Sequence, residues 1–506
     1  MPAYNFVYQR FGFKHAALLL AVLFAALYPF FQYVFDVDAV GYITVTQHYA
    51  AGAWKDAING YWSPLNSWLM VPFVKIGLPP AICFKVANLC FGIGILYQTQ
   101  KLLRAFSFTP KQKTGLLLTV TCMVLYYSFA ELAADTLFIW MFLVYVNIVM
   151  KRNFNISVKA NVCAGLMAAI VFFSKTYGLA FFLLHFSFIH FFWVPFVLKK
   201  GWHVKKFLLG MLAFALLVVP WICLLWYKYG FVTFGYAGKL NMSWMLMGGQ
   251  PDYQPYFFEP AYNGALSKWV DPIYSQTNIY GPAQSKMLLL REIKVILYNI
   301  KIMVWDAFWI SFFWPLILLG IWLKRKSHLP LQIVFWIILL FPIIYLLVVI
   351  EERYMWPISI LMLMGGGYVL QRFFNNKKYA WLLLFMSFCI GPVIKLVQYI
   401  NKDKAAHQLA SYIQQNNIQG PFTSVDVDEE MHKAAFLTNN KYYAVAHQYG
   451  SFDKLETEAR SKSIKVICVA YKNLDSATAF TQTAFFKTHQ PELVAVDNMK
   501  MWLIRL

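Results

Sequence analysis

Residues 13–43 read FKHAALLLAVLFAALYPFFQYVFDVDAVGYI, an apolar run that ends in two closely spaced carboxylates, Asp36 and Asp38. The run is long enough to cross a lipid bilayer, which requires about 20 apolar residues. It is too long for the apolar core of a signal peptide, and it lacks a small-residue cleavage site. The segment therefore predicts an uncleaved first membrane span that delivers acidic side chains to the far side of the membrane.

The whole chain has the composition of a polytopic membrane protein. Of its 506 residues, 60% are hydrophobic and 13% are charged, with a mean hydropathy of +0.52. A soluble globular chain carries about a quarter charged residues. The first span and ten further apolar runs predict a polytopic α-helical protein with about 11 transmembrane helices. The further runs lie near residues 81–100, 114–130, 132–150, 160–174, 177–198, 207–229, 300–323, 330–350, 354–371 and 380–398.

The net charge of +21 is unevenly distributed along the chain. Nineteen of the 44 lysines and arginines lie in six short segments without Asp or Glu, whereas the other 25 are balanced by 23 acidic residues. This is the positive-inside pattern of membrane proteins, so nucleic acid is excluded as a partner. With eleven spans, the N-terminus is predicted in the cytoplasm and the C-terminus outside it. The six segments are 1–15, 101–113, 151–159, 199–206, 324–328 and 372–378.

Two segments outside the cytoplasm are too long to be simple turns. Residues 36–80 contain amphipathic pieces around 40–51 and 64–76, which are expected to lie along the membrane surface. Residues 230–292 are rich in Gly, Pro, Tyr and Asn, which predicts an irregular aromatic loop.

The chain divides into two predicted domains. Residues 1–399 contain the apolar spans, whereas in residues 400–506 helical patterns alternate with β-rich runs. The second segment carries 12 basic and 11 acidic residues. It is therefore predicted to be a small soluble α/β domain on the outer side of the membrane.

Asp36 and Asp38 are the first candidates for chemistry because they follow directly after a span. A carboxylate at that boundary can abstract a proton or bind a metal ion just above the lipid. The alternative is a structural one, in which these residues cap the helix that follows, since Asp is a favoured N-cap.

Isolated ionisable residues also mark the outer ends of later spans. Asp135 and Lys175 stand in apolar surroundings, which indicates function, although a lysine there can also snorkel to the interface. Glu351, Glu352 and Arg353 are expected in a tight outer turn between two spans. The planar fork of an arginine suits a phosphate, and the alternative is a local Glu–Arg pair that closes the turn. All these groups share the outer face, where nucleotide-activated donors are absent, so group transfer there requires a group activated on a membrane lipid.

The first outer loop carries the motif through which the chain resembles a known family. Asp38, Tyr42 and AAGAW at 50–54 look like the Asp-x-x-x-Tyr…Ser-Gly-x-Trp pattern of the GT-C membrane glycosyltransferases. Within that superfamily, the chain resembles the bacterial branch near the protein O-mannosyltransferases and the lipid A aminoarabinose transferases. The resemblance covers most of residues 10–400 in layout.

Three later motifs extend the resemblance: AADTLF at 133–138, Lys175 in SKTYGL, and ERYMWP at 352–357. The family implies transfer of a sugar from a polyprenyl-phosphate carrier to an acceptor hydroxyl on a lipid, glycan or protein, with inversion, at the periplasmic face of a bacterial inner membrane. The resemblance makes Asp38 the general base, with Asp36 or Asp135 setting the electrostatic field around it. It makes Lys175, Arg353 and Tyr354 the groups that hold the carrier phosphate.

Two departures from the family pattern separate this chain from the aminoarabinose transferases. Tyr61 and Trp62 replace a Glu-Lys pair, and Gly41 replaces an Arg of the first-loop motif. The first departure removes an expected metal or phosphate contact, so no cofactor is assigned and a divalent metal ion is kept as an alternative. The rival functions are a flippase for lipid-linked oligosaccharides and a non-enzymatic membrane scaffold.

Overall fold

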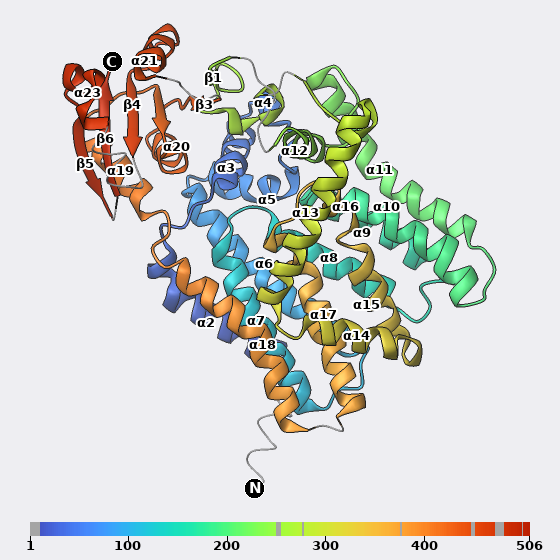
Figure 1. Cartoon of the computed structure of the whole chain (residues 1–506). Helices are drawn as coiled ribbons and strands as arrows, with labels where there is room; N and C mark the ends of the chain where they lie inside the picture. The colour runs from blue at the N-terminus through green and yellow to red at the C-terminus, as the bar shows by residue number, and fades with distance from the viewer. Residues whose placement is uncertain are drawn as a thin grey trace.

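The structure is a computed structural model that describes residues 11–248, 255–275, 278–374, 377–446, 451–470, 480–497 and 499–506. Residues 249–254 and 276–277 of the predicted aromatic loop therefore lie outside the described residues, as do residues 1–10 of the first basic segment and 375–376 of the last. Long helices dominate residues 11–398 (Figure 1). They are α2 (Phe13–Phe31), α3 (Val37–Ala50), α4 (Trp54–Ala57), α5 (Pro64–Lys75), α6 (Pro80–Leu103), α7 (Pro110–Ala130), α8 (Asp135–Val149), α9 (Val158–Ser174), α10 (Tyr177–Phe188) with its π-helical continuation η1 (Ile189–Val197), α11 (Val204–Tyr229), α12 (Ala237–Leu246), α13 (Lys286–Ile310), α14 (Trp314–Lys324), α15 (Leu329–Leu340), α16 (Ile343–Leu346), α17 (Glu352–Phe373) and α18 (Lys378–Gln398), with 3-10 turns η2 (Lys268–Val270), η3 (Pro272–Ser275), η4 (Pro282–Gln284) and η5 (Arg325–Ser327).

The apolar runs predicted from the sequence are helical. Among the described residues, seven helices are long and apolar enough to cross a membrane, or eight if one bent pair forms a single span. The helices α8 and α9 are also apolar but only 15 and 17 residues long. The polytopic helical fold is confirmed, while length and composition support fewer complete spans than the eleven predicted.

The predicted span at 300–323 is not one straight helix. Its residues belong to α13 and α14, which meet at an angle of 93°. Pro315 stands in the first turn of α14, where proline is tolerated because its missing N–H is unpaired there anyway. A proline inside one continuous helix would instead have removed a backbone hydrogen bond.

The predicted surface helices of the first outer segment exist, but α3 does not lie on a surface. It occupies the first amphipathic piece and α5 the second. Most of the side chains of α3 are buried, including Val40, Ile43 and Val45. The helix packs against α5 and against η2 of the second outer segment. Its first turn is therefore held inside the protein, which fixes the two carboxylates at its start.

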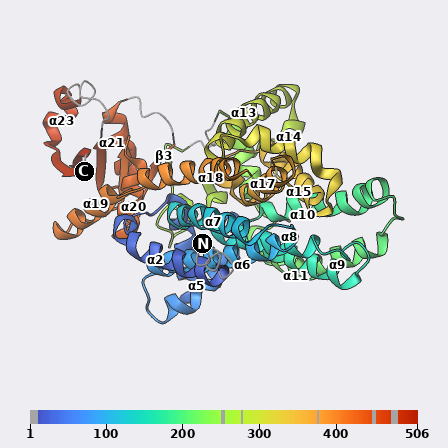
Figure 2. The same ribbon diagram turned by 90° about the horizontal axis from the view of Figure 1, so that it is seen from below.

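The C-terminal residues form a sheet covered by helices, on one side of the bundle in both views (Figures 1 and 2). The sheet has the order β2-β4-β6-β5, in which β2 is parallel to β4 and the other pairs are antiparallel. A second sheet pairs β1 of the aromatic loop with β3, Phe257 opposite Val445. The loop predicted to be irregular thus contributes a strand to the C-terminal part. The elements are β1 (Phe257–Phe258), α19 (Lys404–Gln415), β2 (Phe422–Val425), α20 (Asp428–Leu437), β3 (Ala444–Val445), α21 (Phe452–Ser461), β4 (Val466–Ala470), α23 (Ala484–His489), β5 (Glu492–Val496) and β6 (Met499–Arg505).

Candidate functional site

Asp36 and Asp38 lie two residues apart and have different surroundings. Asp36 is the N-cap of α3, and its Oδ1 accepts a hydrogen bond from the Ala39 amide at 2.7 Å. Its Oδ2 accepts from the Leu132 amide at 2.8 Å, which joins α3 to the connection between α7 and α8. Burial and the charge of Asp38 raise the pKa of Asp36. Asp36 therefore acts as a structural brace, while Asp38 lines the cavity described below.

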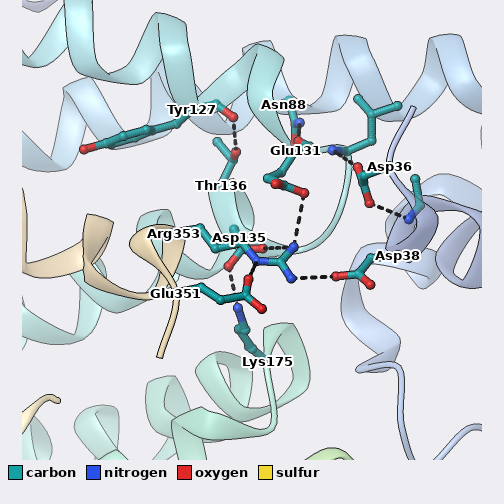
Figure 3. A network of polar contacts seen from close by, with 12 residues as sticks. Asp36, Asp38, Asn88, Tyr127, Glu131, Asp135, Thr136, Lys175, Glu351 and Arg353 are labelled. Carbon is teal, nitrogen blue, oxygen red and sulfur yellow. Dashed lines mark hydrogen bonds and ion pairs between the residues drawn. The ribbon is translucent and has the colours of Figure 1, made fainter. Parts of the chain in front are cut away.

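Arg353, in the first turn of α17, lies at the centre of a group of carboxylates (Figure 3). Its Nη2 is 2.9 Å from Oδ2 of Asp38, its Nη1 is 3.1 Å from Oε2 of Glu131, and its Nε is 2.7 Å from Oε2 of Glu351. Each contact uses a different nitrogen of the planar fork, as guanidinium geometry allows. Arg353 thus fixes three helix ends relative to one another: those of α3, α7 and α17.

Lys175 is the second basic side chain of the site. It is the residue directly after α9, and its Nζ lies 2.5 Å from Oδ1 of Asp135, the first residue of α8. The same Nζ lies 4.2 Å from the centre of the Tyr354 ring, within the range of a cation–π contact. Asp135 also lies 3.9 Å from Nη1 of Arg353. Lys175 is therefore bound inside the site rather than extended towards the membrane interface.

The cluster has more acidic than basic side chains. Glu131 is largely buried, and this burial raises its pKa well above the usual value. The neighbouring Asp36 shows a shift in the same direction. The charged members are Asp36, Asp38, Glu131, Asp135, Glu351, Lys175 and Arg353.

The charged cluster forms one wall of a cavity of about 490 Å³. A second wall is aromatic, with an asparagine among the rings. The cavity thus brings charged groups and aromatic rings together in one lining, and it is large enough for a small organic group. Its charged lining residues are Asp38, Asp135, Lys175, Glu351 and Arg353, and Tyr42, Tyr345 and Tyr354 also line it. The aromatic wall consists of Tyr61, Trp62, Asn241, Trp244 and Trp269.

The two departures at Gly41 and Trp62 belong to one packing arrangement. A Cβ atom at Gly41 would lie 2.3 Å from the Trp62 ring, so the indole occupies the space of a side chain at position 41. The Trp62 Nε1 donates to the Trp269 carbonyl oxygen at 2.8 Å. Oδ1 of Asn59 accepts from the backbone amides of Tyr61 and Trp62, at 2.8 and 2.9 Å. These contacts hold the first outer loop against the second.

A further polar group joins the same two loops at the end of α11. Nζ of Lys228 lies 2.8 Å from Oδ2 of Asp271, and both side chains are buried. The Tyr229 hydroxyl donates to the same oxygen at 2.7 Å and accepts from the Gly60 amide at 3.0 Å. A buried carboxylate requires such partners to offset its loss of hydration. This group was missed from the sequence because Asp271 has no apolar span beside it.

The sequence-predicted residues mostly meet in one place. Asp38, Asp135, Lys175, Arg353 and Tyr354 all line the cavity, whereas Asp36 is not among its lining residues. The local Glu351–Arg353 pair considered as an alternative is also present, alongside the longer-range pairs of Arg353.

Sequence reasoning missed the role of Glu131 within the motif that contains Asp135. The feature that could have revealed it is a carboxylate four residues before Asp135, at the end of an apolar run. Among the described residues, no three His, Cys, Asp or Glu side chains come together as metal ligands would. The positive charge at the centre of the carboxylates belongs to Arg353.

Comparison with solved structures identifies the fold. The chain is similar to ArnT from Cupriavidus metallidurans bound to undecaprenyl phosphate, with 12% identity, 97% of each chain covered and a TM-score of 0.59. It is similar to the Archaeoglobus fulgidus oligosaccharyltransferase in the apo form, with 11% identity, 91% of this chain and 70% of that chain covered and a TM-score of 0.52. No protein-family model and no curated protein sequence matches the chain. The structural likeness confirms the predicted GT-C-like fold.

Proposed function

We propose that the chain is a membrane glycosyltransferase that moves a sugar from a polyprenyl-phosphate carrier to an acceptor hydroxyl. The observation that carries this proposal is the cavity in which Asp38, Arg353 and Lys175 face one space beside an aromatic wall. The likeness to ArnT bound to undecaprenyl phosphate supports a lipid-phosphate donor. A flippase would need charged groups along a path through several spans, whereas the charged groups described above gather where α3, α7, α8, α9 and α17 end or begin.

Asp38 is the proposed general base. Arg353 binds its Oδ2, and 31% of the side chain remains exposed, so its other oxygen can accept the proton of an acceptor hydroxyl. The acceptor oxygen then attacks the anomeric carbon and forms the new glycosidic bond. The bond from that carbon to the carrier phosphate oxygen breaks, and the phosphate leaves with the electron pair. Attack opposite the leaving phosphate inverts the anomeric configuration.

Lys175 and Arg353 are the proposed partners of the leaving phosphate, with Tyr354 beside them. They lie on the same wall of the cavity as Asp38, where fixed charges stabilise the negative charge that develops on the phosphate. Arg353 has three carboxylates within hydrogen-bond distance and Asp135 at 3.9 Å, so a phosphate must share it with Asp38. Lys175 has Asp135 as its closest partner and is therefore the proposed main phosphate ligand.

The proposed setting is a bacterial inner membrane, with the N-terminus in the cytoplasm and residues 400–506 in the periplasm. The acceptor is a lipid, a glycan or a protein. The basic segments without Asp or Glu support this orientation, because short cytoplasmic loops of membrane proteins carry an excess of Lys and Arg. Mass spectrometry of envelope lipids, glycans and proteins from a deletion strain would identify the sugar and its acceptor.

Asp38→Asn is the variant that tests the base. The substitution leaves the cap of α3 in place, because Asp36 and not Asp38 makes that bond. A positioned general base contributes about 10²–10⁴-fold, so transfer per mole of folded protein should fall by that factor. The assay uses purified protein in liposomes with a polyprenyl-phosphate sugar, with and without divalent metal. Near-parental turnover of Asp38→Asn would remove Asp38 from the mechanism.

A further inference from the structure

The helix α20 of the C-terminal part contacts both outer segments that line the cavity. It lies beside α3 in the fold and is one of the elements packed against it (Figure 1). His432 contacts Ser267 of the second outer segment, and the Phe436 ring stacks on Phe35, the residue just before the first. Lys433 pairs with Asp403, which in turn bonds the Phe35 amide. One helix outside the bundle therefore contacts residues that lie close in sequence to two groups of cavity-lining residues.

The first contact of α20 is with the segment that carries the proposed base. Nζ of Lys433 lies 2.8 Å from Oδ1 of Asp403, and the two side chains are only 3% and 8% exposed. Oδ2 of the same Asp403 accepts a hydrogen bond from the Phe35 amide at 2.9 Å. The Phe436 ring stacks on the Phe35 ring, with their centres 5.5 Å apart. Since Phe35 is three residues before Asp38, these contacts fix the entry of the chain into α3.

The membrane helices hold the other end of the same segment. Lys85 of α6 donates to the Phe31 carbonyl oxygen at 3.2 Å and to that of Gln32. Lys85 is almost fully buried, so this contact is shielded from water. The segment from Phe31 to Asp38 is therefore fixed from α6 on one side and from α20 on the other.

The second contact of α20 is with the aromatic wall. Nε2 of His432 lies 2.8 Å from Oγ of Ser267, and both residues are buried. The Tyr442 amide donates to the Leu266 carbonyl oxygen at 2.7 Å, next to the pairing of β1 with β3. Trp269, two residues after Ser267, lines the cavity, and its backbone carbonyl oxygen accepts the hydrogen bond from the Trp62 indole. The position of Trp269 thus depends on the C-terminal part.

We infer that α20 aligns the two walls of the cavity, with Lys433 as a positioning residue for Asp38 and His432 as a positioning residue for Trp269. The inference rests on the proposed function and gives the C-terminal part a task in that same site. Misplacing a catalytic group by about 1 Å can cost roughly 10²-fold in rate, so a brace of this kind acts on turnover without touching substrate.

Four variants of the full-length protein test the inference. In Lys433→Met the Asp403 carboxylate loses its cation, and kcat should fall roughly 10- to 100-fold while the KM for the donor stays near the parental value. Lys433→Arg restores a cation and should recover most of kcat. Ser267→Ala removes the partner of His432 and should mainly raise the donor KM, about fivefold for one lost hydrogen bond. Arg460→Met is the matched control, because it removes an exposed ion pair on α21.

Amide hydrogen exchange gives a readout that does not depend on activity. Lys433→Met should speed exchange in residues 33–40, and Ser267→Ala in residues 258–271, with Arg460→Met changing neither. Unchanged exchange and a parental kcat in Lys433→Met would overturn the inference. A Lys433→Arg variant whose kcat stays as low as that of Lys433→Met would overturn it as well. If the parent protein transfers no sugar, the proposed function fails, while the exchange data still decide whether α20 fixes the two segments.

Discussion

Replacing Arg353 with Lys separates the charge of this residue from its shape. The variant keeps one positive charge near the cavity but replaces a planar fork with a single nitrogen. In the parent protein three nitrogens bind three carboxylates, those of Asp38, Glu131 and Glu351, at 2.9, 3.1 and 2.7 Å. One ammonium group cannot occupy all three nitrogen positions. The contact to Asp38 is expected to be lost because Glu351 and Glu131 lie on the other two sides of the fork.

The size of the effect follows from that one contact. A hydrogen bond between charged groups contributes about 1.5–3 kcal/mol, which corresponds to roughly 10- to 150-fold in rate. This range applies to the Asp38 contact alone, because Glu351 is 45% exposed and its pair is screened by water. We therefore expect kcat of Arg353→Lys to fall by that factor. The donor KM should change little, since a positive charge remains beside the phosphate.

The measurement is steady-state transfer in liposomes, normalised to folded protein, for the parent, Arg353→Lys and Asp38→Asn. The double variant is the control, since two residues that act through one contact should not lose rate additively. The reasoning is refuted if Arg353→Lys keeps kcat within about twofold of the parent, a change worth less than one such contact. It is equally refuted if the losses of the two single variants simply multiply.

The remaining predictions concern one residue of the cavity and one of α20. Lys175→Met leaves Asp135 without its closest cation, and polyprenyl phosphate should bind at least about tenfold more weakly in a direct binding assay, since a charge-assisted contact is lost. A parental affinity for polyprenyl phosphate would show that Lys175 interacts with Asp135 and not with the phosphate. Burial, with smaller effects of Lys268 and Lys433, lowers the pKa of His432 from 6.5 to about 3. Between these two pKa values the imidazole is protonated in the unfolded chain and neutral in the folded protein. The free energy of unfolding should therefore fall as the pH drops below about 6.5, by up to about 1.4 kcal/mol per pH unit. Tm measured from pH 7 to about 4.5 should therefore fall less in His432→Phe than in the parent, and equal slopes would contradict the assignment.

The sequence was sufficient to predict the helical membrane fold because lipid imposes a local rule. A span must be apolar over its whole length, so each run can be recognised without knowledge of its neighbours. The same reasoning did not show the break at residues 300–323, because the mean hydropathy stays high across the start of a new helix at Trp314. It also placed α3 on a surface, because amphipathicity does not tell which partner covers the apolar face.

The candidate site could be predicted only in part. Carboxylates and cations at the outer ends of spans were recognisable one by one, as with Asp38, Asp135 and Lys175. Their pairing was not recognisable, since Arg353 meets Glu131 across 222 residues and no sequence period encodes such a distance. The link from Lys433 through Asp403 to the Phe35 amide was equally hidden, because it depends on how residues 400–506 are placed against the start of α3.

Under the proposed function, the two departures from the family pattern concern the part of the cavity that faces the sugar and not the part that binds the phosphate. The Trp62 ring fills the space above Gly41, so both departures belong to the aromatic wall. The charged wall is held by other contacts, which run from Arg353 and Lys175 to the ends of α3, α7 and α8. Under the proposed function, the leaving phosphate depends on the charged wall, and the shape of the sugar depends on the wall that contains Trp62.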